Sequence, residues 1–188
     1  MPTKNIIMLF FIVFSSFSQL VWAKTNNNKS ELTVEADESL EWFEKEKYYL
    51  AKGNVILKKD GVTLKANIIK ADYVFENGEN ILKKIIAKDK VVLTKENTKA
   101  TGQYMIYDLK EKIARILGSF QTFSSPSGYV ESTKNIIFDD VNNKARAEGN
   151  VKIILSNKTV IYADNVKADF EPTKKSLKKA IAKGNVVI

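Results

Sequence analysis

The chain offers few side chains that could carry out chemistry. Its 188 residues include no cysteine and no histidine, which removes the usual metal ligands and the usual general base. Asp139 and Asp140 are the only adjacent aspartates. They follow an aromatic residue in an expected turn, where solvation or capping of the turn accounts for them. The sequence therefore predicts a protein that is not an enzyme and that holds no metal or cofactor.

The charge balance favours an anionic partner. Lysine and arginine number 30 against 22 aspartates and glutamates, and Arg115 and Arg146 are the only arginines. In an exported protein, this excess suits an anionic lipid or a polyanionic glycan, and not nucleic acid. The alternative is that the lysines solvate outer strand faces and protect sheet edges from pairing.

The first 23 residues have the pattern of a secretory signal peptide. Lys4 supplies a positive start, residues 6–14 are all apolar, and Val-Trp-Ala at residues 21–23 predicts cleavage after Ala23. The alternative is an uncleaved membrane anchor, but the apolar run is about half of the roughly 20 residues that a bilayer span needs. Residues 24–30 are then expected to form a flexible stub, and residues 31–188 to form one exported domain without disulfides.

A short phrase recurs along this domain. Residues 51–55 (Ala-Lys-Gly-Asn-Val) return in similar form at 147–151 and 182–186, with weaker copies at 87–91 and 116–120. We interpret the middle of each copy as a turn, which gives turns at positions 53, 89, 118, 149 and 184. Their spacing of roughly 29–36 residues is typical of stacked units that cannot bury their own apolar faces alone. The function is then expected in a long shared surface and not in one catalytic pocket.

An aromatic residue follows four of these turns at a regular distance, and an apolar residue precedes each aromatic by two positions. The aromatics are Tyr73, Tyr107, Phe138 and Phe170, and the preceding residues are Ala71, Met105, Ile136 and Ala168. Residues 66–73 and 163–170 are the most similar copies, and their apolar residues alternate with Asn, Lys and Asp. Alternation with a period of two predicts strands with one buried face.

Each unit is expected to follow the same antiparallel plan. A strand leads from the turn into a tight hairpin, and the next strand ends at the aromatic. The hairpins are expected at residues 59–61, 96–97, 125–128 and 156–158, and second turns at 76–78, 110–111, 141–143 and 171–173. We interpret residues 38–47 and 173–181 as parts of this pattern and not as helices. The fold class is therefore predicted to be all-β.

The domain begins and ends with half a unit, so both edges are expected to be bare strands. Two unlike bare edges favour head-to-tail contact, including self-association, because exposed strands pair readily and heterologous contacts form open assemblies. The alternative is that the C-terminus is frayed or cut short.

These residues resemble a known family. Residues 32–188 resemble the LptA/OstA-type domain of lipopolysaccharide transport. The resemblance rests on the recurring pattern A-[KE]-G-N-V, followed by a hairpin and then A-x-x-[IV]-x-A-D-[YF], and on residues 35–42 and 52–55. The resemblance implies a twisted, partly open β-jellyroll of about sixteen strands. It also implies a periplasmic bridge that binds lipopolysaccharide. The bridge would join similar domains of inner-membrane component C and outer-membrane component D.

The resemblance further implies that acyl chains travel through an apolar interior. The residues expected to line it are Val55, Leu57, Ile69, Ala71, Tyr73, Met105, Tyr107, Ile136, Phe138, Val166, Ala168 and Phe170. Three alternatives remain: a structural β-repeat with a filled interior, the related component C, and a basic protein that only coats anionic membranes. Component C keeps an N-terminal anchor helix, and the leader here is short and polar by comparison.

Overall fold

The computed structural model describes residues 32–171 and 177–188, and every regular element in these ranges is a β-strand. The predicted signal peptide, the stub and most of the turn expected at 171–173 lie outside the described residues. Within the described residues there is no helix with the length and hydropathy needed to cross a membrane. The all-β prediction is confirmed.

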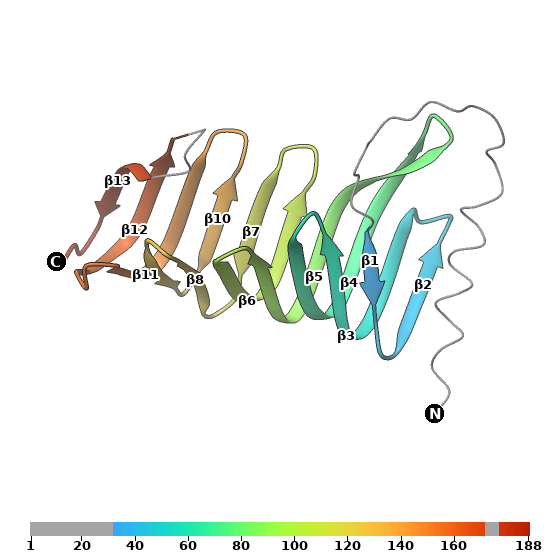
Figure 1. The fold of residues 1–188 in the computed structure, drawn as a ribbon, viewed down its shortest axis with the longest axis horizontal. Helices are drawn as coiled ribbons and strands as arrows, with labels where there is room; N and C mark the ends of the chain where they lie inside the picture. The colour runs from blue at the N-terminus through green and yellow to red at the C-terminus, as the bar shows by residue number, and fades with distance from the viewer. Residues whose placement is uncertain (1–31, 172–176) are drawn as a thin grey trace.

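Thirteen antiparallel strands form one continuous sheet (Figure 1). The first six are β1 (Thr33–Glu35), β2 (Ser39–Phe43), β3 (Tyr48–Lys59), β4 (Val62–Glu76), β5 (Glu79–Lys95) and β6 (Thr98–Asp108). The others are β7 (Ile113–Leu117), β8 (Gln121–Ser125), β9 (Gly128–Ser132), β10 (Asn135–Asp139), β11 (Lys144–Leu155), β12 (Val160–Phe170) and β13 (Leu177–Lys183). Residues 38–47 and 177–181 thus contribute strands, as the repeat predicts, and not helices.

The strands stack along the chain, so the molecule is elongated. The main pairing path is β1-β3-β4-β5-β6-β7-β10-β11-β12-β13, which follows sequence order. Figure 1 accordingly shows β1 and β2 at one end of the long axis and β13 at the other. The main pairing path of the described strands thus has two separate ends, as expected for a partly open jellyroll.

The long strands bend, and the bend divides the sheet into two layers. The pairing of β3 with β4 shifts register between Lys52 and Val55, and that of β11 with β12 shifts between Glu148 and Val151. On one side of the bend β3 pairs with β2, and on the other side it pairs with β1. We call the part that contains β2, β7, β10 and β13 layer 1, and the part that contains β1, β8 and β9 layer 2. The bent strands β3, β4, β5, β6, β11 and β12 contribute to both.

The recurring Gly-Asn phrase forms these bends and not chain-reversing turns, so that part of the sequence interpretation is wrong. Gly53 and Asn54 lie inside β3 with φ angles of 81° and 41°, and Gly149 and Asn150 lie inside β11 with 86° and 43°. Two consecutive residues in the left-handed region turn a strand out of its plane without ending its pairing. The thirteen strands agree roughly with the expected number of about sixteen.

The chain reverses instead at the hairpins that the sequence predicts. Asp60-Gly61 joins β3 to β4 and Asn77-Gly78 joins β4 to β5, with positive φ at all four residues. Both pairs suit the hairpin turns whose twist matches that of the strands. The hairpins of layer 1 and layer 2 lie at the ends of the layers remote from the bend, and no strand pairing in the described residues joins them.

Candidate functional site

The inner face of layer 1 carries an uninterrupted apolar row that crosses ten strands. Each member is the cross-strand partner of the next, so the row follows the long axis of the molecule. From β2 to β13 its members are Leu40, Ala51, Ile69, Ala87, Met105, Ile116, Ile136, Ala147, Val166 and Ala182. All except the two terminal members are buried. The row therefore forms a continuous apolar floor beside the bend.

A second inward row, further from the bend, changes in size along the molecule. Its members from β2 to β13 are Trp42, Tyr49, Ala71, Ile85, Tyr107, Ala114, Phe138, Ala145, Ala168 and Ala180. Aromatic and branched side chains dominate its N-terminal half. Its last three members are alanines. Because inward side chains fill the space between the layers, the C-terminal end has the most room.

Layer 2 faces these rows with its own apolar row. Its members from β1 to β12 are Val34, Leu57, Leu64, Leu93, Ala100, Phe123, Val130, Ile153 and Ile161. Sequence reasoning identified only Leu57 in this row, although strand alternation was the signal that could have found the others. The interior is thus apolar on both sides, and the sides separate toward the unpaired hairpin ends.

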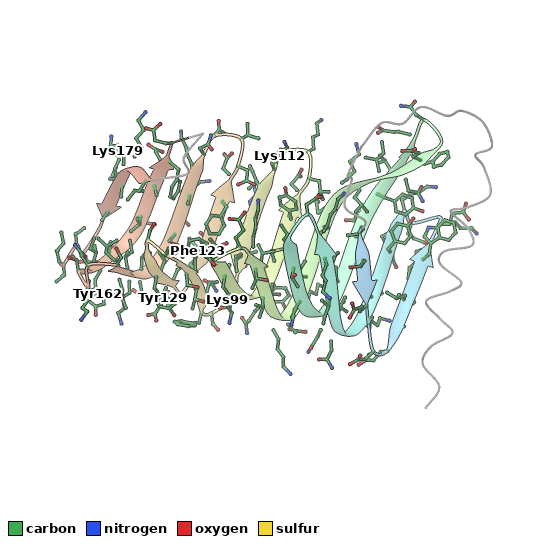
Figure 2. All side chains as sticks on the ribbon, in the orientation of Figure 1. Lys99, Lys112, Phe123, Tyr129, Tyr162 and Lys179 are labelled. Carbon is green, nitrogen blue, oxygen red and sulfur yellow. The ribbon has the colours of Figure 1, made fainter. Side chains whose placement is uncertain are left out.

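An aromatic contact joins the two layers near the middle. The rings of Phe123 in layer 2 and Phe138 in layer 1 have centroids 4.9 Å apart and are tilted by 53°. Both residues pack against each of the two core clusters, one N-terminal and one C-terminal. Figure 2 labels Phe123 near the middle of the long axis. This pair therefore divides the interior into a densely packed N-terminal part and a smaller C-terminal cluster.

The N-terminal end of the interior is occupied by aromatic side chains. Trp42 donates a hydrogen bond of 2.7 Å from Nε1 to the hydroxyl of Tyr73. The ring of Tyr49 lies 4.9 Å from that of Tyr73 and 6.3 Å from that of Trp42. Burial raises the pKa of the Tyr49 hydroxyl, and burial with the negative charge of Asp140 raises that of Tyr107. Both phenols therefore stay neutral at physiological pH.

All twelve residues predicted to line the interior occupy inward positions. Seven are buried: Val55, Leu57, Ile69, Tyr73, Met105, Ile136 and Val166. The other five are half-buried: Ala71, Tyr107, Phe138, Ala168 and Phe170. Sequence reasoning missed Phe123, which lies outside the repeated phrase. It also missed Gln121, a fully buried residue whose side-chain amide has no hydrogen-bond partner in the described part of the chain.

Both ends of the interior expose apolar side chains. At the N-terminal end, Leu40 and Trp42 are 40% and 50% exposed. At the other end, Leu177 on β13 and Val187 are 53% and 60% exposed, and Val187 extends layer 2 by pairing with Tyr162. Among the described residues, each end therefore has two backbone edges without a strand partner, one from each layer.

Asp139, the first of the two adjacent aspartates, has a structural role. Asp139 accepts hydrogen bonds from the backbone N–H and the Nδ2 of Asn142, at 2.9 and 2.8 Å. These bonds lower the pKa of Asp139, and they cap the turn between β10 and β11. The turn-capping interpretation thus explains this carboxylate without catalysis.

Comparisons with known proteins agree with this architecture. A crystal structure of LptH matches the chain with a TM-score of 0.51, at 14% sequence identity, covering 84% of this chain and 94% of LptH. LptH is the LptA-homologous periplasmic component of the lipopolysaccharide transport device of Pseudomonas aeruginosa. At this identity the match establishes the fold. No curated protein sequence matches the chain.

The family assignment rests on the sequence. Residues 33–137 match the family described as LptA/(LptD N-terminal domain) LPS transport protein. The matched segment runs from β1 to β10 and covers more than half of the chain. Together with a bent, two-layered sheet whose apolar interior is open along one side, this match places the chain in the LptA/LptD N-terminal family of lipopolysaccharide transport proteins.

Proposed function

We propose that this protein carries lipopolysaccharide between membranes, with the acyl chains held between layer 1 and layer 2. The observation that supports this most strongly is the apolar row that crosses ten strands without a polar interruption. A globular core needs no such length in one direction, whereas a path for lipid does. Each methylene moved from water into this interior contributes about 0.8 kcal/mol.

The open side of the sheet suits the head group. Hairpins of the two layers remain unpaired with one another in the described residues, so a bulky polar group can protrude while the acyl chains stay inside. Lysines close to these hairpins, such as Lys110 and Lys112, are exposed and could meet phosphate groups as point charges. The alanine-lined C-terminal end, at Ala145, Ala168 and Ala180, is where we expect the chains to enter most deeply.

The two exposed ends support assembly end to end. In the described part of the chain, the edge made by β1 and β2 and the edge made by β13 and Val187 each expose apolar side chains and backbone groups that no strand pairs with. We propose that the N-terminal edge meets a similar domain of inner-membrane component C and the C-terminal edge one of outer-membrane component D. Copies of this chain would join head to tail by the same contact. The proposed location is the periplasm, reached after cleavage behind Ala23.

Photo-crosslinking to lipopolysaccharide tests this function. A photoreactive residue would replace Ile69, Met105, Ile136 or Phe170, one at a time, and Lys70 would serve as the control. Lys70 neighbours Ile69 on β4 but points outward, where it pairs with Asp72 at 2.6 Å. We expect lipid adducts at the inward positions and none at Lys70. Folded variants that give no adducts at any inward position would instead indicate a structural β-repeat whose interior is only a core.

A further inference from the structure

The outer face of layer 1 carries a row of three apolar and three cationic side chains that the transport function does not use. Its members are consecutive cross-strand partners on β6, β7, β10, β11, β12 and β13. They are Ile106, Arg115, Ile137, Arg146, Lys167 and Ile181, and we call them the basic outer strip. The inward neighbours of each member belong to the interior rows, so these six side chains point away from the interior.

The three cations of the basic outer strip are not neutralised within the protein. Arg115, Arg146 and Lys167 form no ion pair in the part of the chain that the structure describes. Toward the N-terminal end, by contrast, Lys70 of the same row pairs with Asp72. Both arginines of the chain flank Ile137 as its two cross-strand partners. Adjacent strands lie about 4.8 Å apart, so the three cations extend over about 15 Å.

The neighbouring row of charged side chains does not offset the positive charge of the strip. The next row toward the hairpins alternates acid and base at Asp139, Lys144, Asp169 and Lys179, so its charges balance. A hollow of about 360 Å³ opens between this row and the strip. Ile137 and Ile181 contribute to its lining together with Arg146 and Lys167. An anionic group could thus approach the cations while an aliphatic group contacts the isoleucines.

We propose that the basic outer strip docks the protein on an anionic phospholipid bilayer. Arg and Lys combine an aliphatic stem with a charged head, which lets them contact phosphate groups at the level where Ile side chains enter the acyl boundary. A soluble polyanion would use the cations but would leave the three isoleucines without a role. The strip runs along the long axis of the molecule. Docking along it therefore lays the protein parallel to the membrane, in a state distinct from an end-to-end bridge.

Vesicle binding by the full mature chain tests the proposal. Phosphatidylglycerol-containing vesicles would be compared with pure phosphatidylcholine vesicles, using the wild type and the triple variant Arg115→Gln, Arg146→Gln, Lys167→Gln. Each cation near an anionic surface contributes roughly a fivefold change in affinity, so the triple variant should bind about 100-fold more weakly at low salt. The binding of the wild type should also weaken as salt rises.

A matched variant distinguishes the effect of this strip on vesicle binding from the effect of the protein's net charge. Lys65, Lys99 and Lys152 point outward from layer 2, and their replacement by Gln removes the same charge. Figure 2 shows Lys99 on the side of the molecule opposite Lys179 of β13. We expect this variant to retain binding within about threefold, because these cations lie away from the docked face. Melting temperatures would confirm that both variants fold.

Three results would overturn the proposal: equal losses in the two triple variants, no wild-type binding to phosphatidylglycerol vesicles, or binding of soluble polyphosphate without binding of vesicles. The last result would assign the strip to a soluble anion. The inference does not depend on the proposed transport function, because interior crosslinking to lipopolysaccharide should be unchanged in the strip variant. Absence of vesicle binding with intact interior crosslinking would show that the docking proposal has failed, and the reverse result would show that the transport proposal has failed.

Discussion

Replacing one alanine in each of two repeat copies by tryptophan should give two different phenotypes. Ala71 and Ala168 occupy the same position of the most similar copies, 66–73 and 163–170. In the structure Ala71 lies between Tyr49 and Ile85, whereas Ala168 lies between Ala145 and Ala180. We expect Ala71→Trp to destabilise the fold, because its site is already filled. Ala168→Trp should fold and obstruct the interior.

The magnitudes follow from buried area and packing. An indole buries about 150–250 Å², so at about 25 cal/mol per Å² the acyl chains that it displaces lose about 4–6 kcal/mol, with a middle value near 5 kcal/mol. The displaced chains regain about half of this free energy by packing on the indole. The remaining loss is near 2.5 kcal/mol, which weakens binding by roughly 60-fold in Kd. For Ala71→Trp, overpacking costs about 1–3 kcal/mol, and Tm should fall by roughly 2–12 °C.

The assay is equilibrium binding of fluorescently labelled lipopolysaccharide, accompanied by thermal unfolding. Asn165→Trp is the control, because Asn165 lies on the same strand as Ala168 but points outward and is exposed. We expect the control to bind as the wild type does. Unchanged binding by a folded Ala168→Trp protein would refute the claim that acyl chains occupy the C-terminal end. Equal losses in Ala168→Trp and Asn165→Trp would show that the effect does not arise in the interior.

Three further predictions concern the fold. Phe123→Ala and Phe138→Ala should each destabilise the protein, and a double-mutant cycle by urea unfolding should give a coupling energy of about 1 kcal/mol; additive effects would contradict an interlayer contact. Gly149→Ala should cost about 2 kcal/mol or more, because φ is +86° and an added Cβ would lie 2.8 Å from the Cβ of Lys134. Gly61→Ala, with φ of +74° and open space, should cost less in the same unfolding assay, and an equal cost would refute the argument about crowding. Because the pKa of Asp139 is lowered in the folded state, its contribution is present above the ordinary value of 3.8 and is lost as pH falls through the folded pKa. The stability difference between wild type and Asp139→Asn should therefore be constant above about pH 5 and shrink below about pH 4, and a difference that grows on acidification would contradict the assigned hydrogen bonds.

Alternation, counted from the repeated phrase, was sufficient to predict many of the residues of layer 1 that face inward, but only Leu57 of the facing row in layer 2. Met105 and Tyr107, for example, were assigned from the repeated spacing of an aromatic and the apolar residue two positions before it, and the structure places both on the inner face. The hairpins at Asp60-Gly61 and Asn77-Gly78 were equally predictable, because their residue types favour positive φ. Both signals are local, which is why one sequence sufficed.

The bends and the width of the interior could not be predicted in the same way. Gly53-Asn54 has the residue types of a hairpin turn, and only pairing with β4 on both sides of it identifies a bend. Ala71 and Ala168 have the same local sequence, but their neighbours across the sheet come from strands far away in the chain. The aromatic contact of Phe123 required layer 2 to be placed opposite layer 1. These features depend on register and layer packing, which a repeat pattern does not encode.

The measurement that tests the central claim most directly is methyl NMR of isoleucine during titration with a soluble lipid A analogue. The chain provides four adjacent pairs that point to opposite faces. The inward members are Ile69, Ile85, Ile136 and Ile153, and the outward members are Ile68, Ile86, Ile137 and Ile154. We expect the inward methyl signals to shift with ligand. Those of Ile68, Ile86 and Ile154 should stay constant, while Ile137 reports separately on the basic outer strip. Shifts confined to outward methyl groups would contradict an interior path for lipid.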